Sequence, residues 1–169
     1  AVGSFGDIMS GTTTGIALPD GFDGKQRLLL TANGNVERIV RAYYDEEVVM
    51  HVLENSRKAA GVYERKVVMH VRGEEIMQAR SMVFVTDEAW LDATERQRVG
   101  VSELFNHMGV LPTFTLHSAG RCPDSAEASH FWRVYSMRAS GMACEITETY
   151  RADVLDRPPK GKRPSLFDH

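Results

Sequence analysis

Apolar and polar residues alternate with a period of two along much of this chain. Successive side chains of a β-strand point to opposite faces, so this alternation predicts strands that have one face in a core. The pattern recurs at residues 36–44, 48–53, 62–71, 76–85, 112–118, 131–139 and 142–152. Short polar connections at 45–47, 72–75 and 140–141 separate neighbouring segments. Such connections are typical of antiparallel hairpins.

Three segments depart from this alternation and predict helices. Residues 25–31 are expected to form the end of a helix, and Asn33-Gly34-Asn35 is expected to form a turn after it. A second helix is predicted around Trp90. A third is predicted to begin with Ser102 as its cap and to stop at Gly109. Strands mixed with a few helices indicate an α+β fold.

The chain length of 169 residues suits a single domain with a substantial core. We place this domain at residues 25–156. It is preceded by a flexible, Gly-, Ser- and Thr-rich segment at 1–24 and followed by a basic, Pro-rich tail at 157–169. A charge run among prolines is expected to stay solvated, so the tail carries no functional assignment.

The overall charge and the cysteines narrow the class of protein. A formal net charge of −3 gives no electrostatic reason to expect binding to nucleic acid or to a membrane. No segment has the ~20 apolar residues that a membrane-spanning helix needs. Cys122 and Cys144 form neither a disulfide framework nor a zinc-binding pattern, which favours a reduced, cytoplasmic compartment. The six histidines lack the spacing of a metal motif, so no metal site is expected.

Two charged residues interrupt the apolar faces of predicted strands. In segment 62–71, Arg65 has the same parity as Tyr63, Val67, Met69 and Val71. In segment 142–152, Glu148 has the same parity as Met142, Cys144, Ile146 and Tyr150. A buried charge is costly unless it is paired or binds a charged group. We therefore expect Arg65 and Glu148 to point into one interior and to form a pocket for a small, polar, anionic ligand.

Three further arginines, Arg38, Arg80 and Arg133, also share parity with apolar neighbours. An excess of inward positive charge fits an anionic ligand such as a carboxylate, which an arginine can bind through two parallel hydrogen bonds. In the alternative interpretation, some of these strands are two-sided or lie at an edge, and the arginines extend to solvent. The pattern alone leaves both interpretations open.

Three motifs resemble the chorismate pyruvate-lyase family, whose members make 4-hydroxybenzoate. The first is Tyr63-Glu64-Arg65-Lys66-Val67-Val68, followed after a hairpin by Gln78-Ala79-Arg80-Ser81, with the two arginines fifteen positions apart. The second is Arg138-Ala139-Ser140-Gly141-Met142-Ala143-Cys144-Glu145-Ile146-Thr147-Glu148, which is similar to the family's Arg-x-Ser-Gly hairpin leading to a Thr-Glu pair. The third is Leu28-Leu29-Leu30-Thr31-Ala32-Asn33-Gly34-Asn35-Val36, which is similar to the entry to the first strand in bacterial members. Their order and spacing extend the resemblance over residues 25–155.

The resemblance implies a six-stranded antiparallel sheet with helical flaps over an internal site. It also implies a lyase that eliminates pyruvate from chorismate and uses no cofactor. By resemblance, Arg65 would hold the ring carboxylate, and Glu148 would face the 4-hydroxyl and act as the acid/base group. Arg80 would line the adjoining pocket, and Arg80 or Arg133 would bind the second carboxylate.

Backbone groups would complete this implied site, through the N–H near Met108 and the turn at Gly34-Asn35. The chain departs from the family at two places that would form the pocket wall. Asn33-Gly34-Asn35 stands where a Ser-Met-Thr stretch is common, and His107-Met108-Gly109 stands near a common Pro-Leu-Gly. Two alternatives therefore remain. One is the same scaffold used as a tailoring cyclase or dehydratase on another small molecule, and the other is a small-ligand-sensing module. We expect a small anionic substrate as partner, and a monomer or homodimer.

Overall fold

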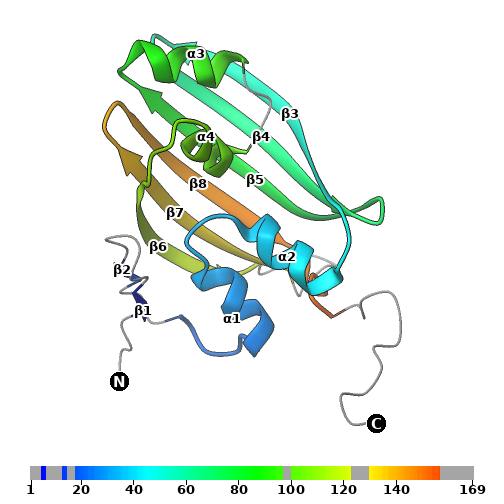
Figure 1. Cartoon of the computed structure of the whole chain (residues 1–169). Helices are drawn as coiled ribbons and strands as arrows, with labels where there is room; N and C mark the ends of the chain where they lie inside the picture. Colours follow the sequence, from blue (N-terminus) through cyan, green and yellow to red (C-terminus); the bar gives the residue numbers. More distant parts are fainter. Residues whose placement is uncertain (1–4, 7–12, 15–17, 97–99, 123–129, 157–169) are drawn as a thin grey trace, which may run out of the picture.

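Six antiparallel strands form the main sheet of this protein (Figure 1). The structure is a computed structural model that describes residues 5–6, 13–14, 18–96, 100–122 and 130–156. The strand order is β3-β4-β5-β8-β7-β6, with bounds Val48–Ala59 (β3), Val62–Val71 (β4), Glu74–Val85 (β5), Thr113–Arg121 (β6), Phe131–Ala139 (β7) and Met142–Tyr150 (β8). Strands β1 (Phe5–Gly6) and β2 (Thr13–Thr14) pair with each other in a separate sheet. The predicted segment 1–24 lies mostly outside the described residues, and the predicted tail 157–169 lies wholly outside them.

The described helices are α1 (Gly24–Thr31), α2 (Val36–Tyr44), α3 (Glu88–Arg96) and α4 (Val101–His107). Figure 1 shows α2 and α4 over the same face of the main sheet. The helices predicted at 25–31, around Trp90 and near Ser102 are all present. The N-cap of α4 is Gly100 rather than the predicted Ser102. Together with the sheet, these helices confirm the α+β class.

Segment 36–44 is helix α2, so its prediction as a strand was wrong. Valine, isoleucine and tyrosine favour strands, but Val36, Val40 and Tyr44 recur every four residues and all are buried. The side chain of Asn35 accepts a hydrogen bond from the backbone N–H of Arg38, as an N-cap does. Arg38 therefore lies on an exposed helix position and not on a strand face.

Arg80 points to the outer face of the sheet, where it is exposed, so its predicted inward position was wrong. The cause is a β-bulge where β4 pairs with β5. Met69 pairs with Met77 and His70 pairs with Glu75, which leaves Ile76 as an extra residue. An extra residue moves every later side chain of the strand to the opposite face. Ile76 itself is buried. Counting from Ile76 therefore assigns Arg80 to the wrong face.

The core consists of two apolar clusters on the covered face of the sheet. One gathers around α1 and α2, with Leu29, Leu30 and Val40 at full burial. The other gathers around α3 and α4, and Leu104 and Phe105 are at its centre. No helix in the described part of the chain is long and apolar enough to cross a membrane.

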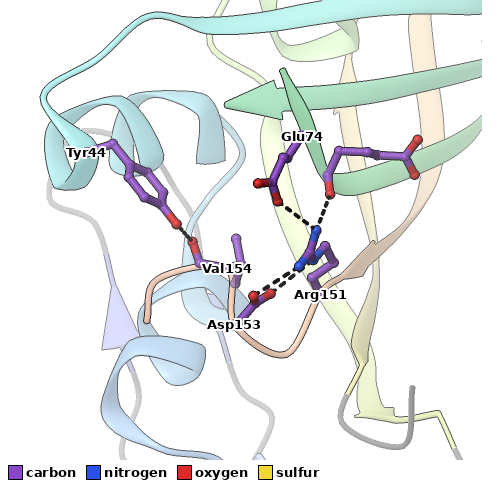
Figure 2. A network of polar contacts seen from close by, with 6 residues as sticks. Tyr44, Glu74, Arg151, Asp153 and Val154 are labelled. Carbon is purple, nitrogen blue, oxygen red and sulfur yellow. Dashed lines mark hydrogen bonds and ion pairs between the residues drawn. The ribbon is translucent and has the colours of Figure 1, made fainter. Parts of the chain in front are cut away.

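The turn after β8 anchors the far end of α2 (Figure 2). The Tyr44 hydroxyl donates a hydrogen bond of 2.7 Å to the carbonyl oxygen of Val154. The Arg151 guanidinium donates to both carboxylate oxygens of Asp153 at 3.0 Å, and it forms an ion pair with Glu74 at 3.3 Å. These contacts tie α2 to the β4–β5 hairpin and to the chain after β8, so the helix that covers the sheet is held at its C-terminal end.

Candidate functional site

A cavity of about 320 Å³ lies between the covered face of the sheet and helices α2 and α4. Its volume is at the lower end of the range typical of small-molecule sites. The floor is largely apolar and comes from four strands, through Met50, Val67, Met69, Met77, Ala79 and Ile146. Three polar side chains interrupt this floor, and they are Ser81, Tyr135 and Glu148. An apolar wall with a few fixed polar groups suits a small ring compound that carries polar substituents.

Glu148 is the buried carboxylate of this cavity, with 6% of its surface exposed. Its Oε2 atom accepts a hydrogen bond from Arg133 Nε at 2.7 Å and another from the Tyr150 hydroxyl. Its Oε1 atom accepts a hydrogen bond of 2.7 Å from the Tyr135 hydroxyl. These donors compensate the burial of the charge. A carboxylate oxygen has two lone pairs, so Oε1 can accept one more hydrogen bond from a ligand.

Arg133 is fully buried and holds Glu148 in place. Besides the ion pair, its Nη1 donates to the carbonyl oxygens of Leu30, at 3.3 Å, and of Ala32. Burial by itself would lower the pKa of Arg133, but the charge and hydrogen bond of Glu148, together with Tyr150 and Tyr135, outweigh this effect and the pKa is raised. The predicted inward position of Arg133 is therefore correct, but its guanidinium binds a protein carboxylate and the end of α1.

The two tyrosines that bind Glu148 are neutral donors. Burial raises the pKa of Tyr135 and of Tyr150 well above the ordinary value, and the charge of Glu148 raises both further. The Arg133 guanidinium also lies 4.5 Å from the ring centroid of Tyr135. Both tyrosines therefore keep their hydroxyl protons at neutral pH, and each donates a hydrogen bond to Glu148.

Arg65 is fully buried on the inner face of β4, as its parity predicted. Its register partner on β5 is Ser81, whereas Glu148 pairs with Ala79 on β5 and with Arg133 on β7. Glu148 thus forms its ion pair with Arg133. Arg65 and Glu148 are both buried, as expected, but β5 lies between their strands. Arg65 is not among the residues that line the cavity, although its neighbour Ser81 is. Burial lowers the pKa of Arg65.

The first turns of α2 and α4 form the mouth of the cavity. Asn35 and Arg38 contribute from the α2 side, and Ser102 and Glu103 contribute from the α4 side. The two sides meet at Gly34, because a Cβ atom there would lie 3.1 Å from Ser102 Oγ. Gly34 also has a φ of +76°, a conformation that favours glycine. The turn before α2 therefore packs against α4 beside the opening.

Two backbone groups proposed by resemblance are already engaged in hydrogen bonds. The Met108 N–H donates to the carbonyl oxygen of Leu104, and the Gly34 N–H donates to that of Ala32. Both amides therefore complete local turns in this structure. Asn35, at the same turn, does line the cavity.

Sequence reasoning missed the partners of Glu148, although one signal was present. A two-residue turn at Ser140-Gly141 pairs residues that are equidistant from it, and Arg133 and Glu148 each lie seven residues away. Tyr135 lies two positions from Arg133 and Tyr150 lies two positions from Glu148, each on the same strand face. In the sequence, both tyrosines look like ordinary core residues. Ser81 carries no such signal. Within the described residues, no group of three or more histidine, cysteine, aspartate or glutamate side chains could hold a metal ion.

Comparisons with known proteins give a distant structural likeness. No family model matches this sequence, and no curated protein matches it. Seven chains of known structure match. One is described as a possible transcriptional regulator, YydK, from Bacillus subtilis subsp. subtilis str. 168. It is 12% identical to this chain, with a TM-score of 0.43, and the match covers 95% of this chain and 77% of that one.

Proposed function

We propose that this chain is a cofactor-independent lyase that eliminates pyruvate from chorismate to give 4-hydroxybenzoate. The observation that carries this proposal is Glu148, a buried carboxylate that faces a small, mostly apolar cavity and keeps room for one more hydrogen bond. The motifs around Arg65 and Glu148 that resemble the chorismate pyruvate-lyase family support it. An apolar cavity with one fixed carboxylate suits a single ring that bears a hydroxyl group.

In the proposed pose, the 4-hydroxyl of the ring donates to Glu148 Oε1. The ring lies on the methionine-lined floor, because flexible thioether side chains adapt to a flat surface. The ring carboxylate points toward Ser81, which lines the cavity and is the register partner of Arg65. A fully buried guanidinium one strand away makes that end of the cavity favourable for an anion.

For this reaction the protein has mainly to orient the substrate and to place charged groups beside it. The ring carbon that bears the hydroxyl loses its proton, the neighbouring carbon–oxygen bond to the enolpyruvyl group breaks, and the ring becomes aromatic. The released enolpyruvate gains a proton and becomes pyruvate. A carboxylate hydrogen-bonded to the 4-hydroxyl lies beside the proton that leaves, so Glu148 is the proposed base.

A second candidate is a module that binds a small organic acid without converting it. One observation favours it: the Glu148 carboxylate already accepts hydrogen bonds from Arg133, Tyr135 and Tyr150. Three donors hold this carboxylate in one orientation, which suits an acceptor for a ligand hydroxyl. Turnover separates the two candidates.

The test is to incubate the purified protein with chorismate and to separate the products by liquid chromatography with mass detection. We expect pyruvate and 4-hydroxybenzoate in equal amounts from the wild type. Glu148→Gln and Arg65→Ala should each lower turnover by at least about a hundredfold. Arg80→Ala is the matched control, because it removes the same charge from the exposed outer face, and it should keep wild-type turnover.

Each outcome bears on one part of the proposal. Full turnover by Glu148→Gln would remove the acid/base role and leave positioning alone. A different hydroxybenzoate isomer would contradict the proposed pose. Saturable binding of 4-hydroxybenzoate without any consumption of chorismate, by a protein whose circular dichroism shows a folded state, would refute the lyase and favour the binding module.

A further inference from the structure

Chorismate carries two carboxylates, and the positions of the arginines show which of them can bind the second carboxylate. This inference rests on the proposed function. Arg80 is exposed on the outer face of the sheet, away from the cavity. Arg133 is fully buried and its Nε and Nη1 atoms bind Glu148 and the carbonyl groups at the end of α1. Neither residue is in a position to bind a carboxylate at the mouth.

Arg38 lies at the mouth of the cavity and, unlike Arg133, is not held in a buried ion pair. It belongs to the first turn of α2 and lines the cavity. The part of the chain that the structure describes offers its guanidinium no ion pair. Arg41, one turn further along the helix, forms an ion pair with Glu37 at 3.5 Å. Within the described residues, Arg38 is therefore the arginine at the mouth that forms no ion pair with a carboxylate of α2.

The start of α2 adds backbone donors beside Arg38. In the first turn of an α-helix, N–H groups lack intrahelical acceptors and carry a partial positive charge. Asn35 Oδ1 caps the N–H of Arg38, whereas the N–H groups of Val36 and Glu37 precede the first helical hydrogen bonds. Because α2 has nine residues, this end is a full helix terminus that can hold an anion.

A separate observation at the floor indicates that the cavity is built for a polar ligand. Ser81 lines the cavity and only 5% of its surface is exposed. Its hydroxyl group has no hydrogen-bond partner among the described residues, and a hydroxyl can donate one hydrogen bond and accept others. A ligand oxygen in the cavity can therefore bind Ser81. Ser81 and the start of α2 would then contact opposite ends of one ligand.

We propose that Arg38, together with the first turn of α2, is the subsite for the second carboxylate of a dianionic substrate. This carboxylate belongs to the arm that leaves as pyruvate, so the departing product lies at the mouth and the ring product stays on the floor. The subsite makes the cavity selective for dicarboxylates over monocarboxylates. Glu103, which lines the mouth from α4, opposes the anion and limits its affinity.

The test compares two ring acids by isothermal titration calorimetry, isophthalate with two carboxylates and benzoate with one. The wild type should bind isophthalate about tenfold more tightly than benzoate. Arg38→Ala should abolish this preference and leave benzoate affinity unchanged, and Arg38→Lys should restore part of it. Glu103→Gln should strengthen isophthalate binding. Arg80→Ala, which changes the net charge equally, should keep the wild-type preference.

Kinetics with chorismate give a second measurement. Arg38→Ala should raise KM about tenfold with kcat changed by less than twofold, because the lost contact is made equally in the ground state and the transition state. A wild type with no preference for isophthalate, or an Arg38→Ala variant that loses benzoate affinity to the same extent, would overturn the subsite. Absence of chorismate turnover with the dicarboxylate preference intact would refute the lyase and leave the subsite standing.

Discussion

Replacing Arg133 with methionine should destabilise this protein severely, because it would leave the Glu148 carboxylate buried without its counter-charge. The change removes the 2.7 Å ion pair and the hydrogen bonds to Leu30 and Ala32 while keeping most of the apolar volume. Breaking one side of a fully buried ion pair costs about 3–5 kcal/mol. Arg133 is 0% exposed and Glu148 is 6% exposed, so solvent screens little of this effect.

The double variant Arg133→Met/Glu148→Gln tests the physical reason for this loss. Glutamine keeps the shape of Glu148 and removes its charge, so the desolvation cost disappears from the double variant. The double variant should therefore be more stable than the sum of the single losses predicts, by about 2–3 kcal/mol. Pairs that do not interact add within about 0.5 kcal/mol.

Urea unfolding, followed by far-ultraviolet circular dichroism and tryptophan fluorescence, gives the free energy of unfolding of each variant. Equal slopes against urea are needed for the comparison. The control Arg80→Ala should change stability by no more than about 0.5 kcal/mol, since its side chain is exposed. A loss below about 1 kcal/mol for Arg133→Met, or additive losses in the double variant, would refute the reasoning.

Three further predictions concern other parts of the molecule. Tyr44→Phe leaves the carbonyl oxygen of Val154 without its 2.7 Å hydrogen bond, so urea unfolding should show a loss of about 1–3 kcal/mol; an unchanged midpoint would contradict this anchor. Hydrogen bonds, first from Lys66 and then from Ser56, lower the pKa of Glu54 from 4.5 to about 2, so their stabilising effect is present above pH 4.5 and is lost as the pH falls through about 2; Lys66→Met should move the titration, followed by NMR, part of the way back toward 4.5. Burial raises the pKa of Cys144 to about 12, so iodoacetamide at pH 8 should label it in urea but not in the folded state; labelling in the folded state would show that the core opens.

Local sequence patterns predicted most of the strands and the inward positions of Arg65 and Glu148. The alternation over 62–71 matches β4 at both ends, and it placed Arg65 on the buried face. The same reasoning placed Glu148 and Arg133 on inner faces of adjacent strands. These predictions succeed because the period of a strand is local: each side chain's face follows from its neighbours two positions away.

The pattern failed where the period changed. One bulge residue, Ile76, inverted the parity of β5 and hid the outward position of Arg80. A run of strand-favouring residues hid the four-residue spacing of α2, and with it the place of Arg38 at the cavity mouth. Both errors arise because bulges and helix caps depend on the partner strand and on packing, which a sequence window does not contain.

The sequence by itself determined the α+β class, the hairpins and the inward faces of Arg65 and Glu148, and it offered Arg133 as a candidate inward arginine. Only the tertiary structure decided that Glu148 pairs with Arg133 and two tyrosines, and that α2 and α4 close a cavity over them. The reason is the strand order. Placing β8 between β5 and β7 puts Glu148 beside Arg133 and separates it from Arg65 by a whole strand. Burial follows from local periodicity, but the choice of partner for a buried charge follows from how distant segments are ordered in space.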